Sequence, residues 1–97
     1  MRREPNIELY ANNNKKGILL SLPLYQIIKS TIIKSIKKSP EKALPLHELI
    51  DNVTKKIPSR VEPWLVLQVK IDLYERGLIR QYFNRDRMQV IEMVRSR

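Results

Sequence analysis

The chain has 97 residues, the size of one small domain, and it contains no cysteine, so disulfides and thiolate metal sites are excluded. No apolar run reaches the ~20 residues that span a bilayer, and the basic start at residues 1–6 leads into no apolar segment, so we expect a cytoplasmic protein without a signal peptide. The net charge of +9 fits a polyanionic partner, nucleic acid above all, but also a charge that only maintains solubility.

A β-hairpin is predicted at the start of the chain, after a basic tail at residues 1–5. Polar and apolar residues alternate over residues 6–10, as in a half-buried strand. Residues 12–17 are rich in Asn and end in Gly, which tolerate the positive φ of a turn, and residues 18–20 are apolar again. We therefore expect the hairpin over residues 6–20.

A first helix is predicted over residues 21–38. Ser21 is a good N-cap, and Pro23 suits the first turn, where its missing N–H costs nothing. Ile27 and Ile33 lie off the core-facing stripe and are expected to touch the hairpin or another subunit. At about 100° per residue, the apolar positions that share one face are Leu24, Tyr25, Ile28, Ile32 and Ile36.

The rest of the chain predicts a short extended segment, two helices and a second hairpin, at residues 43–45, 47–57, 62–76 and 78–94. Pro63 fits the first turn of the third helix, and Gly77 is its C-terminal stop. This order predicts a mainly α fold with a small β component, a single winged helix-turn-helix domain over residues 1–97. Three helices and a C-terminal β-hairpin, the wing, follow the N-terminal hairpin.

The stretch from Trp64 to Ile79, WLVLQVKIDLYERGLI, resembles the third helix and first wing strand of winged-helix proteins, in which a Leu four residues before a Gly packs inward. It is also similar to a family of short, uncharacterised prokaryotic proteins with a Trp-led helix, an Asp-Leu pair, and a Gly followed by an aliphatic strand. That family begins with strand-turn-strand and has a Tyr early in its first helix, here residues 7–20 and Tyr25. The resemblance covers about residues 7–83 and implies a fold without an activity.

Enzyme chemistry finds no support in the sequence. His47 is the single histidine, whereas a zinc site needs three or four ligands and nucleophilic catalysis needs a base beside its nucleophile. With only Gly17 and Gly77, no phosphate-binding loop exists. Asp72 and Arg76, four residues apart, are interpreted as an ordinary helix ion pair. We expect no enzyme, no cofactor, no metal and no small-molecule ligand.

Basic residues favour duplex DNA as the partner, although a solvated charged rim is the alternative. Arginines on the wing suit the minor groove or the phosphates, lysines before the third helix suit the backbone, and two polar side chains on that helix could read bases. The candidate DNA-binding residues are Lys55, Lys56, Arg60, Gln68, Lys70, Arg80, Arg85 and Arg87.

The third helix also carries an apolar stripe opposite its core-facing side, formed by Trp64, Leu67 and Ile71. A helix that is apolar on two faces is usually buried on both. The cover is the N-terminal hairpin, a second subunit or a different protein, and we expect Trp64 to be mostly buried in the working protein. Two hypotheses follow: a DNA-binding protein, such as a transcriptional regulator with weak sequence readout, or a protein-interaction or homodimerisation module without DNA readout.

Overall fold

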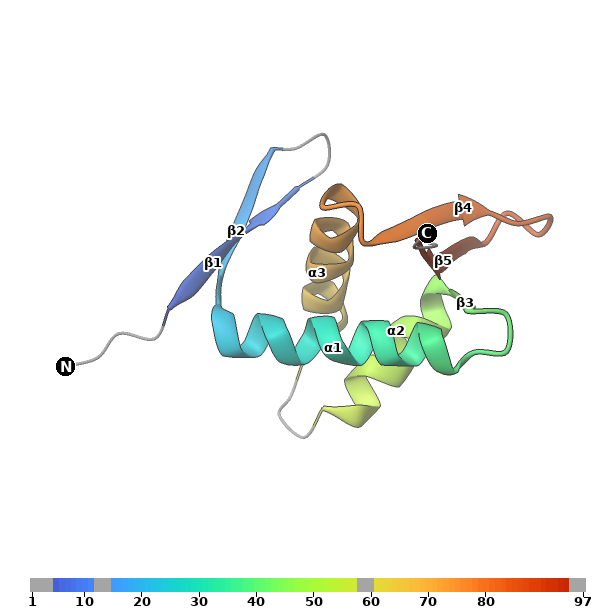
Figure 1. Ribbon diagram of the computed structural model, residues 1–97, viewed down its shortest axis with the longest axis horizontal. Helices are drawn as coiled ribbons and strands as arrows, with labels where there is room; N and C mark the ends of the chain where they lie inside the picture. The colour runs from blue at the N-terminus through green and yellow to red at the C-terminus, as the bar shows by residue number, and fades with distance from the viewer. Residues whose placement is uncertain (1–4, 12–14, 58–60, 95–97) are drawn as a thin grey trace.

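The computed structural model describes residues 5–11, 15–57 and 61–94. Within these ranges the chain forms three helices and five strands, and the strands make two small antiparallel sheets (Figure 1). The order of elements is as predicted, and each helix begins and ends within one residue of its predicted limits. The elements are β1 (Asn6–Tyr10), β2 (Lys16–Ser21), α1 (Leu22–Lys38), β3 (Ala43–Pro45), α2 (Leu46–Lys56), α3 (Pro63–Glu75), β4 (Ile79–Phe83) and β5 (Gln89–Met93).

Helix α1 begins and ends where its local chemistry predicts. The Ser21 hydroxyl accepts a hydrogen bond from the Leu24 N–H at 3.3 Å, which confirms the N-cap. Lys37 and Lys38 stand in the last turn, where positive charge suits the helix dipole. The buried face of α1 packs against α2 and α3 and consists of Tyr25, Ile28, Ile32, Ser35 and Ile36.

The two sheets differ in size. The first pairs β1 with β2 only, and its register shifts between Glu8 and Tyr10. At this bulge the backbones approach closely, because a Cβ on Gly17 would lie 2.9 Å from the Leu9 carbonyl oxygen. The second sheet has the order β3-β5-β4, so the predicted extended segment at residues 43–45 is a third strand beside the C-terminal hairpin.

The core lies between the three helices and takes in side chains from both sheets. Leu73 of α3 is fully buried, as the spacing to Gly77 predicts, and Gly77 itself has a φ of +79°, a conformation that favours glycine after a helix. None of the described helices is long and apolar enough to cross a membrane.

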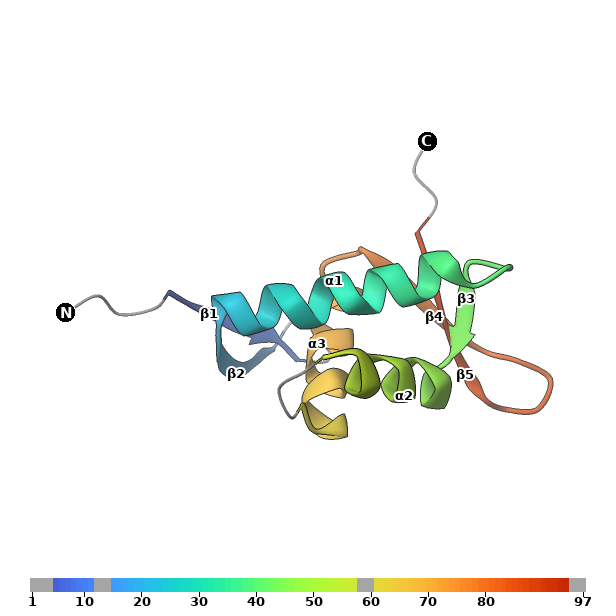
Figure 2. The ribbon, with the colours of Figure 1, turned by 90° about the horizontal axis from the view of Figure 1, so that it is seen from below.

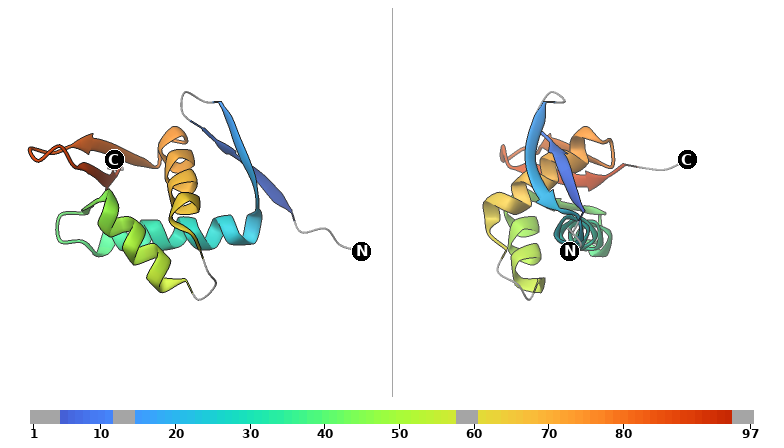
Figure 3. Two further views of the ribbon diagram at one scale, coloured as in Figure 1. Left: turned by 180° about the vertical axis from the view of Figure 1, so that it is seen from behind. Right: turned by 90° about the vertical axis from the view of Figure 1, so that its left-hand side faces the viewer.

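The elements place two surfaces on opposite sides of the molecule. Seen from below, α1 lies on one side, whereas α2, the first turns of α3 and the loop between β4 and β5 lie on the other (Figure 2). The N-terminal hairpin and the β4–β5 hairpin stand at opposite ends, with α3 between them (Figure 3).

Candidate nucleic-acid interface

The loop between β4 and β5 is organised by Asn84. The Asn84 side-chain oxygen accepts hydrogen bonds from the backbone N–H groups of Asp86, at 2.9 Å, and Met88, at 3.0 Å. The Asn84 carbonyl also accepts from the Arg87 N–H, and the Asn84 N–H donates to the Met88 carbonyl, both at 3.0 Å. These bonds close a tight loop of three residues, 85–87, so its exposed side chains project from a fixed turn.

Two exposed arginines, Arg85 and Arg87, stand on this loop. Arg87 has a φ of +61°, in the left-handed region that glycine and asparagine adopt at lower cost. A residue with a Cβ at such a position costs about 1 kcal/mol or more. The turn therefore carries a guanidinium group at a position where the backbone would favour glycine.

Three more of the predicted cations, Lys55, Lys56 and Arg80, are on the surface, and two of them have weak ion pairs. Lys55 Nζ lies 3.4 Å from Asp51 Oδ2, one turn away on α2, and Lys56 is exposed. Arg80 Nε lies 3.8 Å from Glu92 Oε1 across the hairpin, with 64% of its side chain exposed. Such pairs contribute about 0–1 kcal/mol and exchange readily for a phosphate. Arg60 lies outside the described residues.

The prediction that Lys70 reads base edges is wrong. Lys70 is only 5% exposed, because β4 and β5 return over α3 and cover it. Its ammonium donates to the side-chain oxygens of Gln81, at 2.9 Å, and Gln89, at 3.3 Å. Burial lowers the pKa of Lys70 below its usual value. Gln68 is half-buried. Of the two residues on α3 that were expected to read bases, Gln68 is the one for which this role stays a prediction.

The second apolar stripe of α3 is partly open in the single chain. Trp64 is 52% exposed, and its indole N–H donates to Glu62 Oε2 at 2.7 Å, while Leu67 and Ile71 are half-buried. The N-terminal hairpin does not provide the expected cover for Trp64, because its bond to α3 is near the other end, at Asp72. Cover by a second subunit or another protein stays a prediction.

Asp72 and Arg76 form the predicted ion pair one turn apart at the end of α3, but it is not an ordinary one, because Asp72 has further partners. Asp72 is fully buried, and it accepts hydrogen bonds from the Tyr25 hydroxyl at 2.6 Å and the Tyr10 N–H at 2.8 Å. Arg76 Nε donates to both carboxylate oxygens at 2.9 and 2.8 Å, and its guanidinium lies 4.8 Å from the centre of the Tyr10 ring. Spacing within α3 could not indicate these partners, which come from β1 and α1.

A cluster centred on the buried Asp72 carboxylate holds the hairpin and two helices together, and its members are Tyr10, Tyr25, Asp72 and Arg76. Burial, then the hydrogen bond to Asp72, raises the pKa of the Tyr25 phenol above its usual value. The hydrogen bond to Asp72 raises the pKa of Arg76. Across the described parts of the chain, no group of three or more His, Cys, Asp and Glu side chains could hold a metal ion.

The candidate interface therefore consists of the wing arginines together with the surface of α2 and the first turns of α3. All of these elements lie on the side of the molecule away from α1 (Figure 2). A shallow depression joins the start of α2 to the wing, and the residues that line it are Leu46, His47, Ile50, Met88 and Gln89.

No protein-family model matches the chain, and no curated protein or solved structure is significantly similar to it. The family resemblance expected from the sequence stays a prediction.

Proposed function

We propose that the chain is a winged-helix protein that binds duplex DNA through its wing and through phosphate contacts. The observation that carries the proposal is the wing loop, where Arg85 and Arg87 project from a fixed turn and Arg87 holds an unfavourable backbone conformation. A strained non-glycine residue at an exposed tip is a reason to look for a functional side chain.

The arrangement of elements supports the winged-helix assignment. A helix, a short strand, two helices and a hairpin follow one another, and the short strand β3 pairs with the returning strand β5. In helix-turn-helix docking, the start of the second helix of the motif enters the major groove, and the helix before it crosses the backbone. Here α3 and α2 correspond to these helices, and the wing lies on the same side (Figure 2).

The proposed contact depends mainly on phosphates. Lys55 and Lys56 at the end of α2 meet the backbone, and the wing arginines enter the minor groove or pair with phosphates. Since Lys70 is covered, the exposed start of α3 has little hydrogen-bonding capacity for bases. We therefore expect strong salt dependence and weak discrimination between sequences.

One observation favours a second candidate function, assembly through α3. Trp64 is 52% exposed beside the half-buried Leu67 and Ile71, and a large apolar surface left open in a small domain often contacts another protein. In this alternative, two copies bury their Trp64 side chains against each other and DNA readout is absent.

The test of DNA binding is a titration of labelled duplexes at several salt concentrations, comparing the wild type with Arg85→Ala/Arg87→Ala. We expect weaker binding to all duplexes alike and a salt slope reduced by about 1 for each lost phosphate contact. The matched control is Lys29→Ala/Lys34→Ala, which removes the same charge from α1 on the opposite side. Unchanged affinity and slope in the wing variant, or an equal loss in the control, contradicts the proposal.

The fluorescence and solution mass of the same samples distinguish assembly through α3 from DNA binding. If α3 mediates a dimer, Trp64 emission shifts to the red on dilution and Ile71→Asp yields monomers. If α3 docks on DNA, the free protein is a monomer with water-exposed Trp64, which duplex DNA quenches. A dimer that shows no affinity for any duplex at low salt favours assembly.

A further inference from the structure

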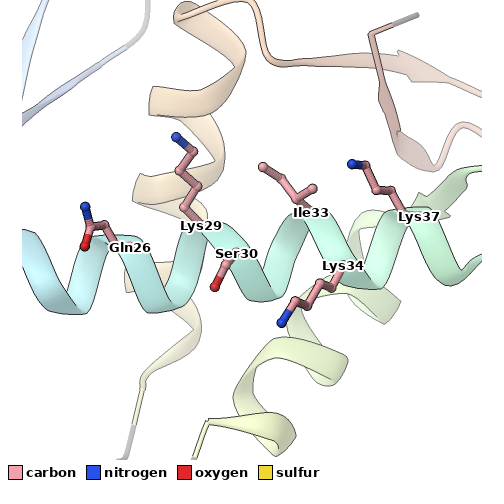
Figure 4. Close-up of a pocket in the computed structure, with 6 residues that line it drawn as sticks. All are labelled: Gln26, Lys29, Ser30, Ile33, Lys34 and Lys37. Atoms are coloured by element: carbon pink, nitrogen blue, oxygen red, sulfur yellow. The ribbon is translucent and has the colours of Figure 1, made fainter.

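The solvent-facing side of α1 carries a groove that the proposed DNA-binding surface does not use. Two parallel rows of side chains, each spaced by four residues along α1, line it (Figure 4). The first row is Gln26, Ser30 and Lys34, and the second is Lys29, Ile33 and Lys37. We call this feature the α1 groove.

Rows spaced by four residues are the ridges that helices use when they pack together, and the groove between two such ridges accepts a ridge of a second helix. At the middle of the α1 groove stand Ile33, which supplies apolar contact, and Ser30, whose short side chain lets a partner approach closely (Figure 4). Lys29 and Lys37 lie one turn to either side of Ile33. The arrangement is a small apolar centre between two positive charges.

The charge around the groove has one sign. Helix α1 contains no Asp or Glu, and across the described residues none of Lys29, Lys34 and Lys37 takes part in an ion pair. Lys42, whose ammonium donates to the Lys37 carbonyl at 2.7 Å, adds a further positive charge at the C-terminal end. A partner that follows the groove therefore gains by carrying carboxylates at its edges.

We propose that the α1 groove binds an acidic amphipathic helix of another protein, with small or apolar residues against Ile33 and Ser30 and carboxylates beside the lysines. A second copy of this chain is disfavoured, because its α1 would bring like charges together. A phosphate backbone would use the lysines and gain nothing from Ile33. A helix uses both features, as in helix-in-groove recognition.

Figure 2 shows α1 on the side of the molecule opposite the β4–β5 loop and the first turns of α3, and the residues of the α1 groove are exposed or half-buried. The two surfaces can therefore be occupied together. If the proposed function holds, the protein connects DNA to an acidic partner. The groove itself does not depend on DNA binding, and its test is separate from the DNA titration.

The experiment is a selection from a displayed library of helical peptides of about the 17-residue length of α1, with one helix face randomised. The library is selected on the wild type alone, so that binding to the variants is measured afterwards without bias. We expect the enriched peptides to carry Glu or Asp on both sides of Ala or Leu positions. By fluorescence anisotropy, they should lose about tenfold or more in affinity with Ile33→Asp and with Lys29→Glu/Lys37→Glu, as for an anchor in an interface.

Three controls make the result specific. Arg85→Ala/Arg87→Ala should bind the selected peptide as the wild type does, and a peptide isomer with Lys in place of Glu should not bind. Circular dichroism melting of each variant checks that the fold is kept. Lys29→Glu/Lys37→Glu leaves Ile33 in place, so it tests the charges separately from the apolar contact. The proposal is overturned if no acidic class is enriched, if the peptides bind Ile33→Asp equally well, or if Lys29→Glu/Lys37→Glu instead abolishes binding to duplex DNA or to phosphatidylserine vesicles.

Discussion

The two hairpins are attached to α3 by buried charges that are two residues apart and unequally compensated. At the end with the N-terminal hairpin, the Asp72 carboxylate meets the Arg76 guanidinium, a phenol and a backbone N–H. At the wing end, the Lys70 ammonium meets two neutral amide oxygens, and the part of the chain that the structure describes places no carboxylate beside it.

The difference shows that burial alone does not decide what a charged residue contributes. A buried charge with an opposite partner and full hydrogen bonding recovers much of its desolvation cost, and loss of one partner is costly. A buried charge with neutral partners keeps a desolvation cost, which appears as the lowered pKa of Lys70. The N-terminal hairpin is thus attached through a charge with an opposite partner, and the wing through a charge that keeps part of its desolvation cost.

The largest effect is expected from Asp72→Asn. The change leaves the Arg76 charge without its partner and places an amide among donors, so the free energy of unfolding should fall by about 3 kcal/mol in chemical denaturation. The side chain of Arg76 is 32% exposed and regains some water, which keeps the loss at the lower end of the range for buried pairs. Asp51→Asn, which removes an exposed pair of the same spacing on α2, is the control and should change stability by less than about 0.5 kcal/mol. Equal losses of stability in Asp72→Asn and Asp51→Asn would show that the buried pair contributes no more than the exposed one.

A smaller loss, about 2 kcal/mol at neutral pH, is expected from Tyr25→Phe, which deletes one hydrogen bond to a charged acceptor. The raised pKa of Tyr25 gives this variant a pH signature. Above its usual value of 10.0 the phenol ionises in the unfolded chain but stays protonated in the folded one, so the wild type loses stability as pH rises. The gap between the wild type and Tyr25→Phe should therefore narrow above pH 10 in denaturation curves. A constant gap would show that the pKa of Tyr25 is not raised in the folded protein.

The smallest effect, and one of opposite sign, is expected from Lys70→Met. A similar apolar chain replaces the desolvated ammonium, so the free energy of unfolding should rise by about 1 kcal/mol at pH 7. Because the pKa of Lys70 is lowered in the folded state, the wild type gains stability as pH rises toward the usual 10.5, and the advantage of the variant should shrink there. Lys56→Met, at an exposed position on α2, is the control. A loss of stability in Lys70→Met would mean that the ammonium and its two amides stabilise the wing.

Most of the fold could be predicted because its signals are local. The Ser21 cap, the proline in the first turn of α3 and the left-handed Gly77 fix the helix ends, and the apolar periodicity of α1 fixes its buried face. The burial of Lys70 and Asp72 and their hydrogen-bond partners could not be predicted from local signals. Both are polar residues on a helix with apolar residues on two sides, and the side chains and strands that bury them come from elements outside α3.

The wing shows the same limit of prediction from local sequence signals. Its arginines could be placed at the tip from the turn signal of residues 84–87, and the structure puts them there, exposed. The positive φ of Arg87 has no signal in its residue type, since it follows from the three-residue loop that Asn84 closes.

The bulge in β1 marks the place where the N-terminal hairpin is hydrogen-bonded to α3. It lies just before Tyr10, whose N–H bonds Asp72 across 62 positions of sequence. A two-stranded hairpin is marginal by itself, so β1 and β2 depend on their packing against α1 and α3 for a fixed position. Both strands are edges of this small sheet, and the exposed charges of Glu8, Lys15 and Lys16 disfavour its pairing with a strand of another chain.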